Sequence, residues 1–173
     1  GAYQAAGDLD RATTLFESTL ADRERVLGPD HPDTLSARNN LAGAYQAAGD
    51  LDRATTLFES TLADRERVLG PDHPNTLSAR NNLAGAYRAA GDLDRATTLF
   101  ESTLADRERV FGPDHPDTLL SRNNLAGSYA AAGDLDRATT LYERTLADFE
   151  RVLGPDHPNT QAVCRNLAQA RAM

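Results

Sequence analysis

The chain has 173 residues, about the length of one ordinary domain, and its 26 acidic and 18 basic residues give it a net charge of −8. Proteins that bind nucleic acids need clustered positive charge, so this evenly spread acidic sequence argues against a nucleic-acid partner. The sequence shows no apolar run of membrane-spanning length and no secretory leader, and its single cysteine, Cys164, excludes an internal disulfide. We therefore expect no membrane partner and a reducing, cytoplasmic compartment.

The sequence repeats itself every 42 residues. Residues 1–42 and 43–84 differ at one position, where Asp33 becomes Asn75, and the copies 85–126 and 127–168 diverge further; residues 169–173 begin another copy. Such a period is typical of an open array in which each unit buries its apolar face only against its neighbours. We expect a single repeat array over residues 1–173, and because the chain opens in mid-repeat we expect a segment of a larger protein. The absence of lysine and isoleucine indicates GC-rich coding, as in a high-GC bacterium.

Two helices, called helix A and helix B, are predicted in each repeat. Residues 1–6 are expected to be the remnant of a broken helix A, and the first helix B is expected to start at Leu9. Further A helices are predicted from Pro32, Pro74, Pro116 and Pro158, and further B helices from Leu51, Leu93 and Leu135.

The copy of helix A at residues 32–48 carries the signals for its own start and end. Apolar and small residues from Leu35 to Ala48 recur in steps of three and four, which forms one helical stripe. Pro32 suits the first helical position, so His31 is expected to cap the helix, and Gly49 is expected to end it in the left-handed conformation.

Helix B, residues 51–69, follows after a short link. Asp50 is a good N-cap, a second apolar stripe runs from Leu51, and Gly70 and Pro71 end the helix. The links of about two and about four residues force neighbouring helices to lie antiparallel, and no stretch alternates with the period of a strand. The fold class is therefore predicted to be all-α.

Several positions of this repeat resemble the tetratricopeptide signature, namely Leu41-Ala42, Tyr45, Gly49-Asp50, Ala54, Phe58 and Leu62. The 42-residue spacing, the RNNLA of helix A and the LGPDHP link are similar to kinesin light chains and to C-terminal arrays of bacterial signalling ATPases. The resemblance implies an α-solenoid of antiparallel helix pairs in a right-handed superhelix. It also implies a non-catalytic scaffold that binds an extended protein or peptide ligand in a concave groove lined by the A helices.

One departure from the family pattern concerns a position early in helix A that is usually aromatic. It is occupied by Arg38, Arg80, Arg122 and then Cys164. We expect each arginine to pack its stem and to reach a carboxylate of an adjacent helix with its head.

Carrying the family's groove positions onto this chain gives the candidate peptide-binding site. Its residues are Asn39, Asn81, Asn123, Gly43, Gly85, Gly127, Gln46, Arg88 and Arg165. The asparagines form a ladder whose amides can pair with a peptide backbone, or alternatively they satisfy helix-end groups. The glycines leave room for a backbone, and the two arginines are suited to a carboxylate. The neighbouring Asn40, Asn82, Asn124 and Asn166 are expected to turn toward the packed side and to be structural.

Other polar patterns are interpreted as structural. One histidine per repeat (His31, His73, His115 and His157) stands beside an aspartate, but helix packing separates the repeats by about 10 Å, so capping is expected instead of metal binding. The charged run from Asp64 to Arg67 is expected to form solvated pairs within helix B. No nucleophile–base pair, phosphate loop or zinc spacing is present, so we expect no enzyme activity, no metal and no cofactor.

Two alternatives for function stay open. The chain could stack head-to-tail, with residues 158–173 of one molecule on residues 9–27 of the next, or it could be an engineered consensus-like scaffold.

A packing prediction follows from two substitutions in the last repeat. Phe149 occupies the position of Arg107 in the preceding repeat, and Cys164 occupies the position of Arg122. We predict that Phe149 packs on Cys164 or on Val163 and is more buried than Arg107.

Overall fold

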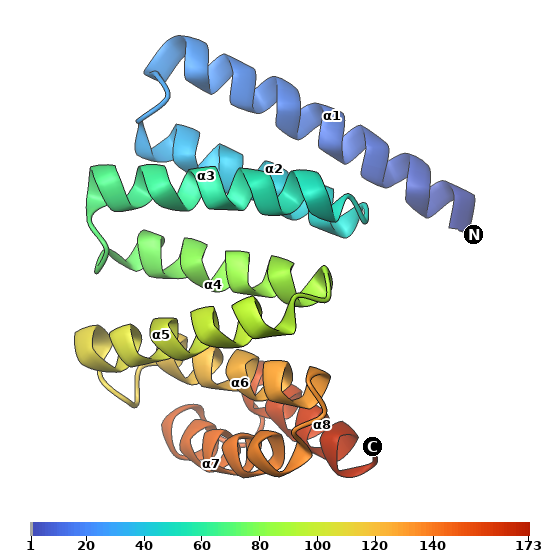
Figure 1. Cartoon of the computed structure of the whole chain (residues 1–173), viewed down its shortest axis with the longest axis vertical. Coiled ribbons are helices and arrows are strands. Elements are labelled where there is room, and N and C mark those ends of the chain that lie inside the picture. The colour runs from blue at the N-terminus through green and yellow to red at the C-terminus, as the bar shows by residue number, and fades with distance from the viewer. Residues whose placement is uncertain (1) are drawn as a thin grey trace. The chain divides into compact units, whose positions relative to one another are not determined.

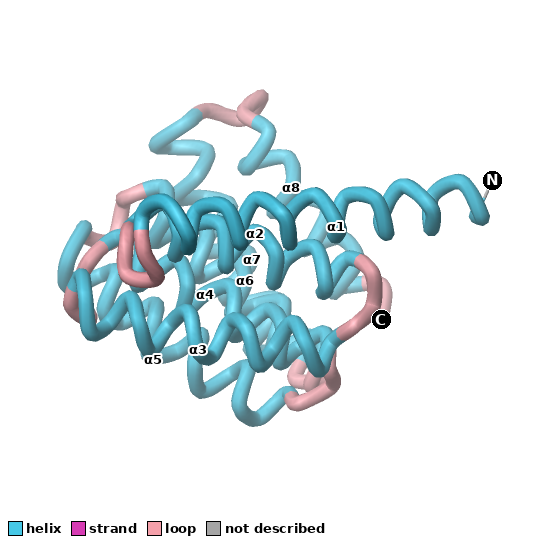
Figure 2. Tube along the Cα trace, turned by 90° about the horizontal axis from the view of Figure 1, so that it is seen from above, coloured by secondary structure: helices cyan, strands magenta, loops and turns pink. Residues whose placement is uncertain are grey.

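The computed structural model describes the backbone of residues 2–173 and the side chains of residue 9 and of residues 11–173. Residues 2–173 contain eight helices and no strand (Figures 1 and 2). The helices are α1 (Ala2–Leu27), α2 (Pro32–Ala47), α3 (Leu51–Leu69), α4 (Pro74–Ala89), α5 (Leu93–Phe111), α6 (Pro116–Ala131), α7 (Leu135–Leu153) and α8 (Pro158–Arg171). The A helices are α2, α4, α6 and α8, and the B helices are α1, α3, α5 and α7, so the predicted all-α fold is confirmed.

The helices group into two compact units, Gly1–Ala90 with α1 to α4 and Gly91–Met173 with α5 to α8. Within each unit every helix packs against the next one along the chain, and the links between them are short. Adjacent helices therefore form antiparallel pairs, as the link lengths predict.

Side chains outside the A helices fix where these helices begin. The Nδ1 atom of His31 accepts a hydrogen bond from the backbone N–H of Asp33 at 3.1 Å, and the equivalent bond recurs at His73, His115 and His157. Each histidine is thus the N-cap of an A helix, with proline at the first helical position. The predicted capping role of the histidines is confirmed, and so is the end signal, because Gly49 has a φ of 82°.

The predicted break at the start of the chain is wrong. Residues 2–27 form one continuous helix, α1, that passes through Gly7 and Asp8 (Figure 1). In the later repeats the same Gly-Asp pair turns the chain, and a full helix A packs against the helix B that follows. Six residues are too few to form a packed helix of their own, whereas adding turns to an existing helix avoids a new nucleation step.

The core of each unit is built from alanine, leucine and aromatic side chains at the predicted stripe positions. In the second unit one buried cluster holds both Phe149 and Val163, which are 0% and 1% exposed. Arg107, the counterpart of Phe149, is 5% exposed, and Cys164 is exposed. The prediction that Phe149 is buried beside Val163 is confirmed, and Val163 is the partner, not Cys164.

Arginines early in the A helices reach carboxylates of adjacent helices, as predicted, and Arg38 and Arg122 each do so on both sides, which links three consecutive helices. Arg122 of α6 is 1% exposed and binds Glu108 of α5 at 3.0 Å and Asp148 of α7 at 2.6 Å. Arg38 of α2 binds Glu24 of α1 at 2.9 Å and Asp64 of α3 at 2.6 Å, with 15% of its side chain exposed.

The prediction of solvated pairs within helix B for the run from Asp64 to Arg67 is confirmed in part, because Arg67 pairs with Asp64 inside α3 at 3.0 Å, but two other contacts differ from it. Arg65 is buried and donates to the carbonyl oxygen of Asn75 at 2.6 Å, whereas Arg67 binds Asp30 of the preceding repeat as well as Asp64. Helical periodicity alone places these residues on one surface helix, but the next A helix covers part of that surface. The charges therefore connect successive repeats.

The N-caps of the B helices make the stability of the fold sensitive to acid. Asp50 accepts the backbone N–H of Arg53 at 3.1 Å, and this bond together with the Arg53 guanidinium holds the pKa of Asp50 below its ordinary value of 3.8; the same holds for Asp92 and Asp134. Because the folded-state pKa is lowered, the stabilisation is complete above pH 3.8 and is lost as the pH falls through the lower folded-state values.

We expect the variant Asp50→Asn/Asp92→Asn/Asp134→Asn to keep its caps, since asparagine caps as well as aspartate does, and to lose part of this acid sensitivity. Urea unfolding of the variant and of the wild type, at neutral pH and below pH 3.8, measures how much each loses of its free energy of unfolding in acid. If the stability of the variant falls as steeply in acid as that of the wild type, the caps do not cause the sensitivity.

Candidate peptide-binding face

The A helices of each unit lie closer together than its B helices. α2 contacts α4 in the first unit and α6 contacts α8 in the second, whereas among the described helices α1 does not contact α3 and α5 does not contact α7. The more closely spaced side of a stack of helix pairs is its inner side. We call the surface that the A helices present on this side the A face; the predicted asparagine and glycine positions lie on it.

The asparagine ladder is linked by hydrogen bonds between neighbouring A helices. Asn39 accepts a hydrogen bond at its Oδ1 from Nδ2 of Asn82 at 3.2 Å, and Asn123 accepts from Asn166 in the same way at 3.0 Å. All four side chains are partly exposed. Among the described residues the Nδ2 group of Asn39 has no hydrogen-bond partner, so its two N–H donors are available to a ligand.

The expectation that the second asparagine of each pair turns into the packed side needs correction. Asn82 and Asn166 lie at the A face and donate to the ladder, and Asn40, in the first A helix, is exposed. Their role is structural, as expected, but it consists in joining two A helices at the surface. Donor and acceptor are 43 residues apart, one more than the length of the repeat, so each bond joins neighbouring A helices.

The groove glycines are not required by the packing of the chain. Gly43 and Gly85 lie inside α2 and α4, neither has a positive φ, and a Cβ atom on either would meet no other atom within 4 Å. A glycine inside a helix costs about 0.5–1 kcal/mol relative to alanine. The fold thus keeps two destabilising residues beside open space at positions where a ligand backbone could approach.

The remaining predicted site residues lie at different depths. Gln46 and Arg88 are half-buried, near the ends of α2 and α4. Arg165 is exposed on α8 and makes no ion pair within the described part of the chain.

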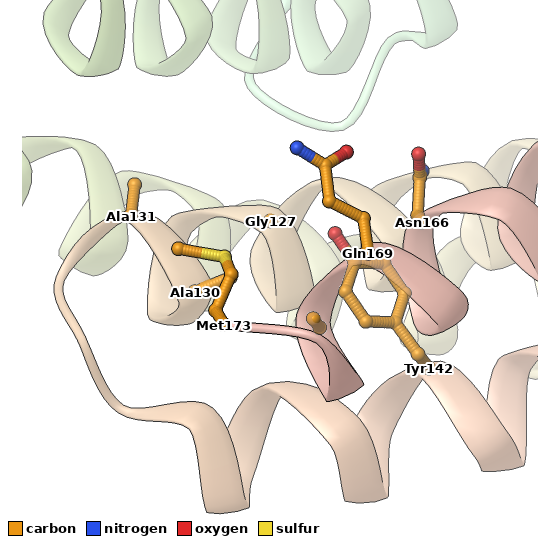
Figure 3. A pocket seen from close by; sticks show the side chains of 8 residues that line it. Gly127, Ala130, Ala131, Tyr142, Asn166, Gln169 and Met173 are labelled. Atoms are coloured by element: carbon orange, nitrogen blue, oxygen red, sulfur yellow. The ribbon is translucent and has the colours of Figure 1, made fainter.

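A hollow of about 240 Å³ opens on the A face of the second unit, between α6 and α8 (Figure 3). It is lined by Gly127, Ala130, Ala131, Tyr142, Asn166, Gln169, Ala170 and Met173. In Figure 3 the amide groups of Asn166 and Gln169 point to the same side of α8. None of the lining residues carries a charge, although a quarter of all residues in the chain are charged.

A recurring tyrosine cluster was missed in the sequence. Tyr45 donates a hydrogen bond from its hydroxyl to Glu17 of α1 at 2.7 Å, and the guanidinium of Arg53 lies 4.5 Å from the centre of its ring. The bond to Glu17 raises the pKa of the Tyr45 hydroxyl. The same arrangement joins Tyr129 to Glu101 and Arg137, and burial is the main cause of the raised pKa of Tyr129.

The fourth repeat shows the signal that could have revealed this cluster. Its tyrosine position is occupied by Arg171, which binds Glu143 at 2.6 Å and so keeps the glutamate paired. In each repeat a glutamate lies 28 residues before this position, whether the position holds a tyrosine, as at Tyr45, or an arginine, as at Arg171. This constant pairing indicates that the same contact recurs in every repeat.

The groups on the A face can form hydrogen bonds and apolar contacts. It offers amide donors and acceptors, open backbone and apolar side chains. Among the described residues no group of three or more His, Cys, Asp or Glu side chains could hold a metal ion. No helix in the described part of the chain is both long and apolar enough to cross a bilayer.

These features define a class of protein, the helical-repeat scaffolds. The sequence matches the tetratricopeptide repeat family over residues 1–67, 36–108, 78–147 and 122–173, which together span the chain, and the chain belongs to this family. The tetratricopeptide repeat is a scaffold that generally carries protein interactions. No curated protein matches the chain.

Solved structures with similar folds support the same assignment. A Podosopora anserina protein described as a kinesin light chain with nearly identical TPR-like repeats has 33% sequence identity and a TM-score of 0.78, over 98% of this chain and 81% of that chain. A variant of that protein in which one glutamine is replaced by methionine has 32% sequence identity and a TM-score of 0.80, over 98% of this chain and 80% of that chain. BtubC (BKLC) from P. vanneervenii has 25% identity and a TM-score of 0.80, over 98% and 67%.

Proposed function

We propose that the chain is a non-catalytic scaffold that binds an extended segment of a protein or peptide partner along the A face. The observation that carries the proposal is the asparagine pair in each unit. In the first unit the amide oxygen of Asn39 accepts a hydrogen bond from Asn82 of the next A helix. The N–H donors of Asn39 remain available to a carbonyl group of a ligand. The helical Gly43 and Gly85 beside open space support the same function.

This arrangement favours recognition of the ligand main chain. Amide groups pair with any peptide unit, whatever its side chain, and the groove glycines leave space for the peptide backbone. Arg88 in the first unit and Arg165 in the second would add contacts to a carboxylate of the ligand. The single free cysteine, Cys164, is consistent with the cytoplasm as the compartment for this function.

The test uses peptides selected from a phage-displayed library of random linear sequences. Asn39→Asp keeps an oxygen for the hydrogen bond from Asn82 but removes the N–H donors. Asn123→Asp does the same in the second unit, where it also removes the bond that Asn123 Nδ2 donates to Asn124 Oδ1 at 3.4 Å. We expect the double variant to bind a selected peptide more weakly by about 1–3 kcal/mol, as for lost hydrogen bonds, measured by calorimetry.

The matched control is Asn40→Asp, which adds the same charge to α2 at an exposed position outside the ladder. It should bind like the wild type. Equal affinity of the double variant and the control, with both chains folded, would show that the ladder does not hold the ligand.

The alternative of head-to-tail stacking stays a prediction. On α1 the apolar Leu15 and Val26 are 67% and 66% exposed, and such a contact would cover them. Sedimentation over a wide concentration range separates the two functions, because a scaffold for other partners remains monomeric whereas a stacking chain grows with concentration.

A further inference from the structure

The A face changes character in the fourth repeat, along one stripe. Three repeats carry Asn, Gly and Ala at four-residue steps, as in Asn39, Gly43 and Ala47 of α2. The equivalent positions on and just after α8 are Arg165, Gln169 and Met173. Each replacement is longer than the residue that it replaces, and all three side chains are exposed, Met173 to 71%.

These longer side chains stand beside the small residues of α6. Gln169 and Met173 line one side of the hollow, and Gly127, Ala130 and Ala131 of α6 line the other (Figure 3). The residues that α6 contributes are thus small, and two of those on the side of α8 are long. A hollow with this construction can receive a side chain, whereas a Cβ atom on Gly43 or Gly85 of the first unit would meet no other atom within 4 Å.

The lining decides the chemistry of that side chain. Alanines and the flexible thioether of Met173 suit an aliphatic group, and the uncharged lining gives no partner to a buried charge. The amides of Asn166 and Gln169 suit the peptide groups on either side of it.

We propose that the hollow between α6 and α8 is a specificity site for one aliphatic side chain, of leucine or methionine type, in the bound segment. This inference rests on the proposed function, because the peptide whose side chain enters the hollow is the one that the pair Asn123–Asn166 of the same unit holds. Gln169 and Met173 on the side of α8 determine which side chain of the peptide is accepted, and the asparagines hold the main chain of that peptide.

The test compares peptides selected on the wild type with peptides selected on the variant Gln169→Ala/Met173→Ala. Both positions are exposed and alanine favours helices, so the variant is expected to fold like the wild type, which circular dichroism checks. The matched control is Gln161→Ala, an exposed glutamine of the same helix outside the hollow.

We expect peptides selected on the wild type and on the control to share one leucine or methionine, and replacing that residue by alanine to weaken binding about 10-fold. On the variant the same replacement should change affinity little. An unchanged preference and an unchanged loss on the variant overturn this inference but leave the proposed function intact. A library that yields no binding peptide on the wild type overturns both.

Discussion

The double variant Arg107→Phe/Ser121→Val is expected to be at least as stable as the wild type, although each single change destabilises the chain. Arg107 is buried and donates to Ser121 Oγ at 3.0 Å and to the carbonyl oxygen of Asp117 at 2.7 Å. Burial lowers the pKa of Arg107, which shows that the protein interior disfavours its charge. The fourth repeat has Phe149 and Val163 at these two positions, both buried in one cluster.

The two positions are coupled because the third and fourth repeats each fill them with matching side chains. Arg107 bonds to Ser121 in the third repeat, and the apolar Phe149 and Val163 are buried together in the fourth. Ser121→Val alone removes an acceptor from a buried guanidinium, and Arg107→Phe alone leaves a buried hydroxyl without its donor, so each should cost about 1–3 kcal/mol. Replacing a buried charged group and its partner together by well-packed apolar residues is often neutral or stabilising.

Urea unfolding of the wild type, the two single variants and the double variant measures the coupling free energy. We expect it to be at least about 2 kcal/mol in favour of the double variant, because the double variant then recovers both single losses of about 1 kcal/mol or more. Ser102→Val, on the exposed side of α5, is the control and should change stability by less than about 0.5 kcal/mol. Additive single effects would mean that the two positions do not share an interface.

The second large effect is expected at Arg122. Its guanidinium is buried and connects α5, α6 and α7 through Glu108 and Asp148. Removing one member of a buried ion pair costs about 3–5 kcal/mol, but the two carboxylates are 40% and 24% exposed and regain some hydration. We therefore expect Arg122→Ala to lower the free energy of unfolding by about 2–3 kcal/mol.

Two comparisons separate the contributions to this loss. Arg122→Met keeps most of the buried stem, so the difference between the Met and Ala variants reports packing, and the remaining loss reports the charge. Arg38→Ala removes the equivalent residue of the first unit, which is 15% exposed, and should cost less. An Arg122→Ala variant with wild-type stability would contradict the role of this arginine as a link between helices.

Much of the fold could be predicted because its signals are local and repeated. Pro32 and His31 fix the start of an A helix, and Gly49 and Asp50 fix the turn to the next helix. The same Gly-Asp signal failed at residues 7 and 8, because a turn forms only where a complete helix packs on each side of it. A local signal thus predicts the turn, and tertiary packing decides whether it forms.

The candidate site was less predictable, because hydrogen bonds and burial depend on neighbours that are distant in sequence. The position of the asparagine ladder followed from the family resemblance, but the bond from Asn82 to Asn39 did not. Arg65 lies by its spacing in the stripe of helix B, but its place in a run of charges led to the prediction of a solvated pair, and in the structure it is buried. The paired change of Phe149 and Cys164 drew attention to the interface around Phe149, but only the structure shows that Val163, and not Cys164, is buried with it.

The contacts between successive repeats have a consequence for the history of the gene. Asp30 with Arg67 and Asp114 with Arg151 join the same two repeat positions in different repeats, and so do Arg38 with Asp64 and Arg122 with Asp148. Unequal recombination that removes or adds one whole 42-residue segment therefore places matching surfaces together again. Alleles that differ by whole repeats are expected to encode folded proteins, so the length of the array can change by recombination without any new interface having to arise.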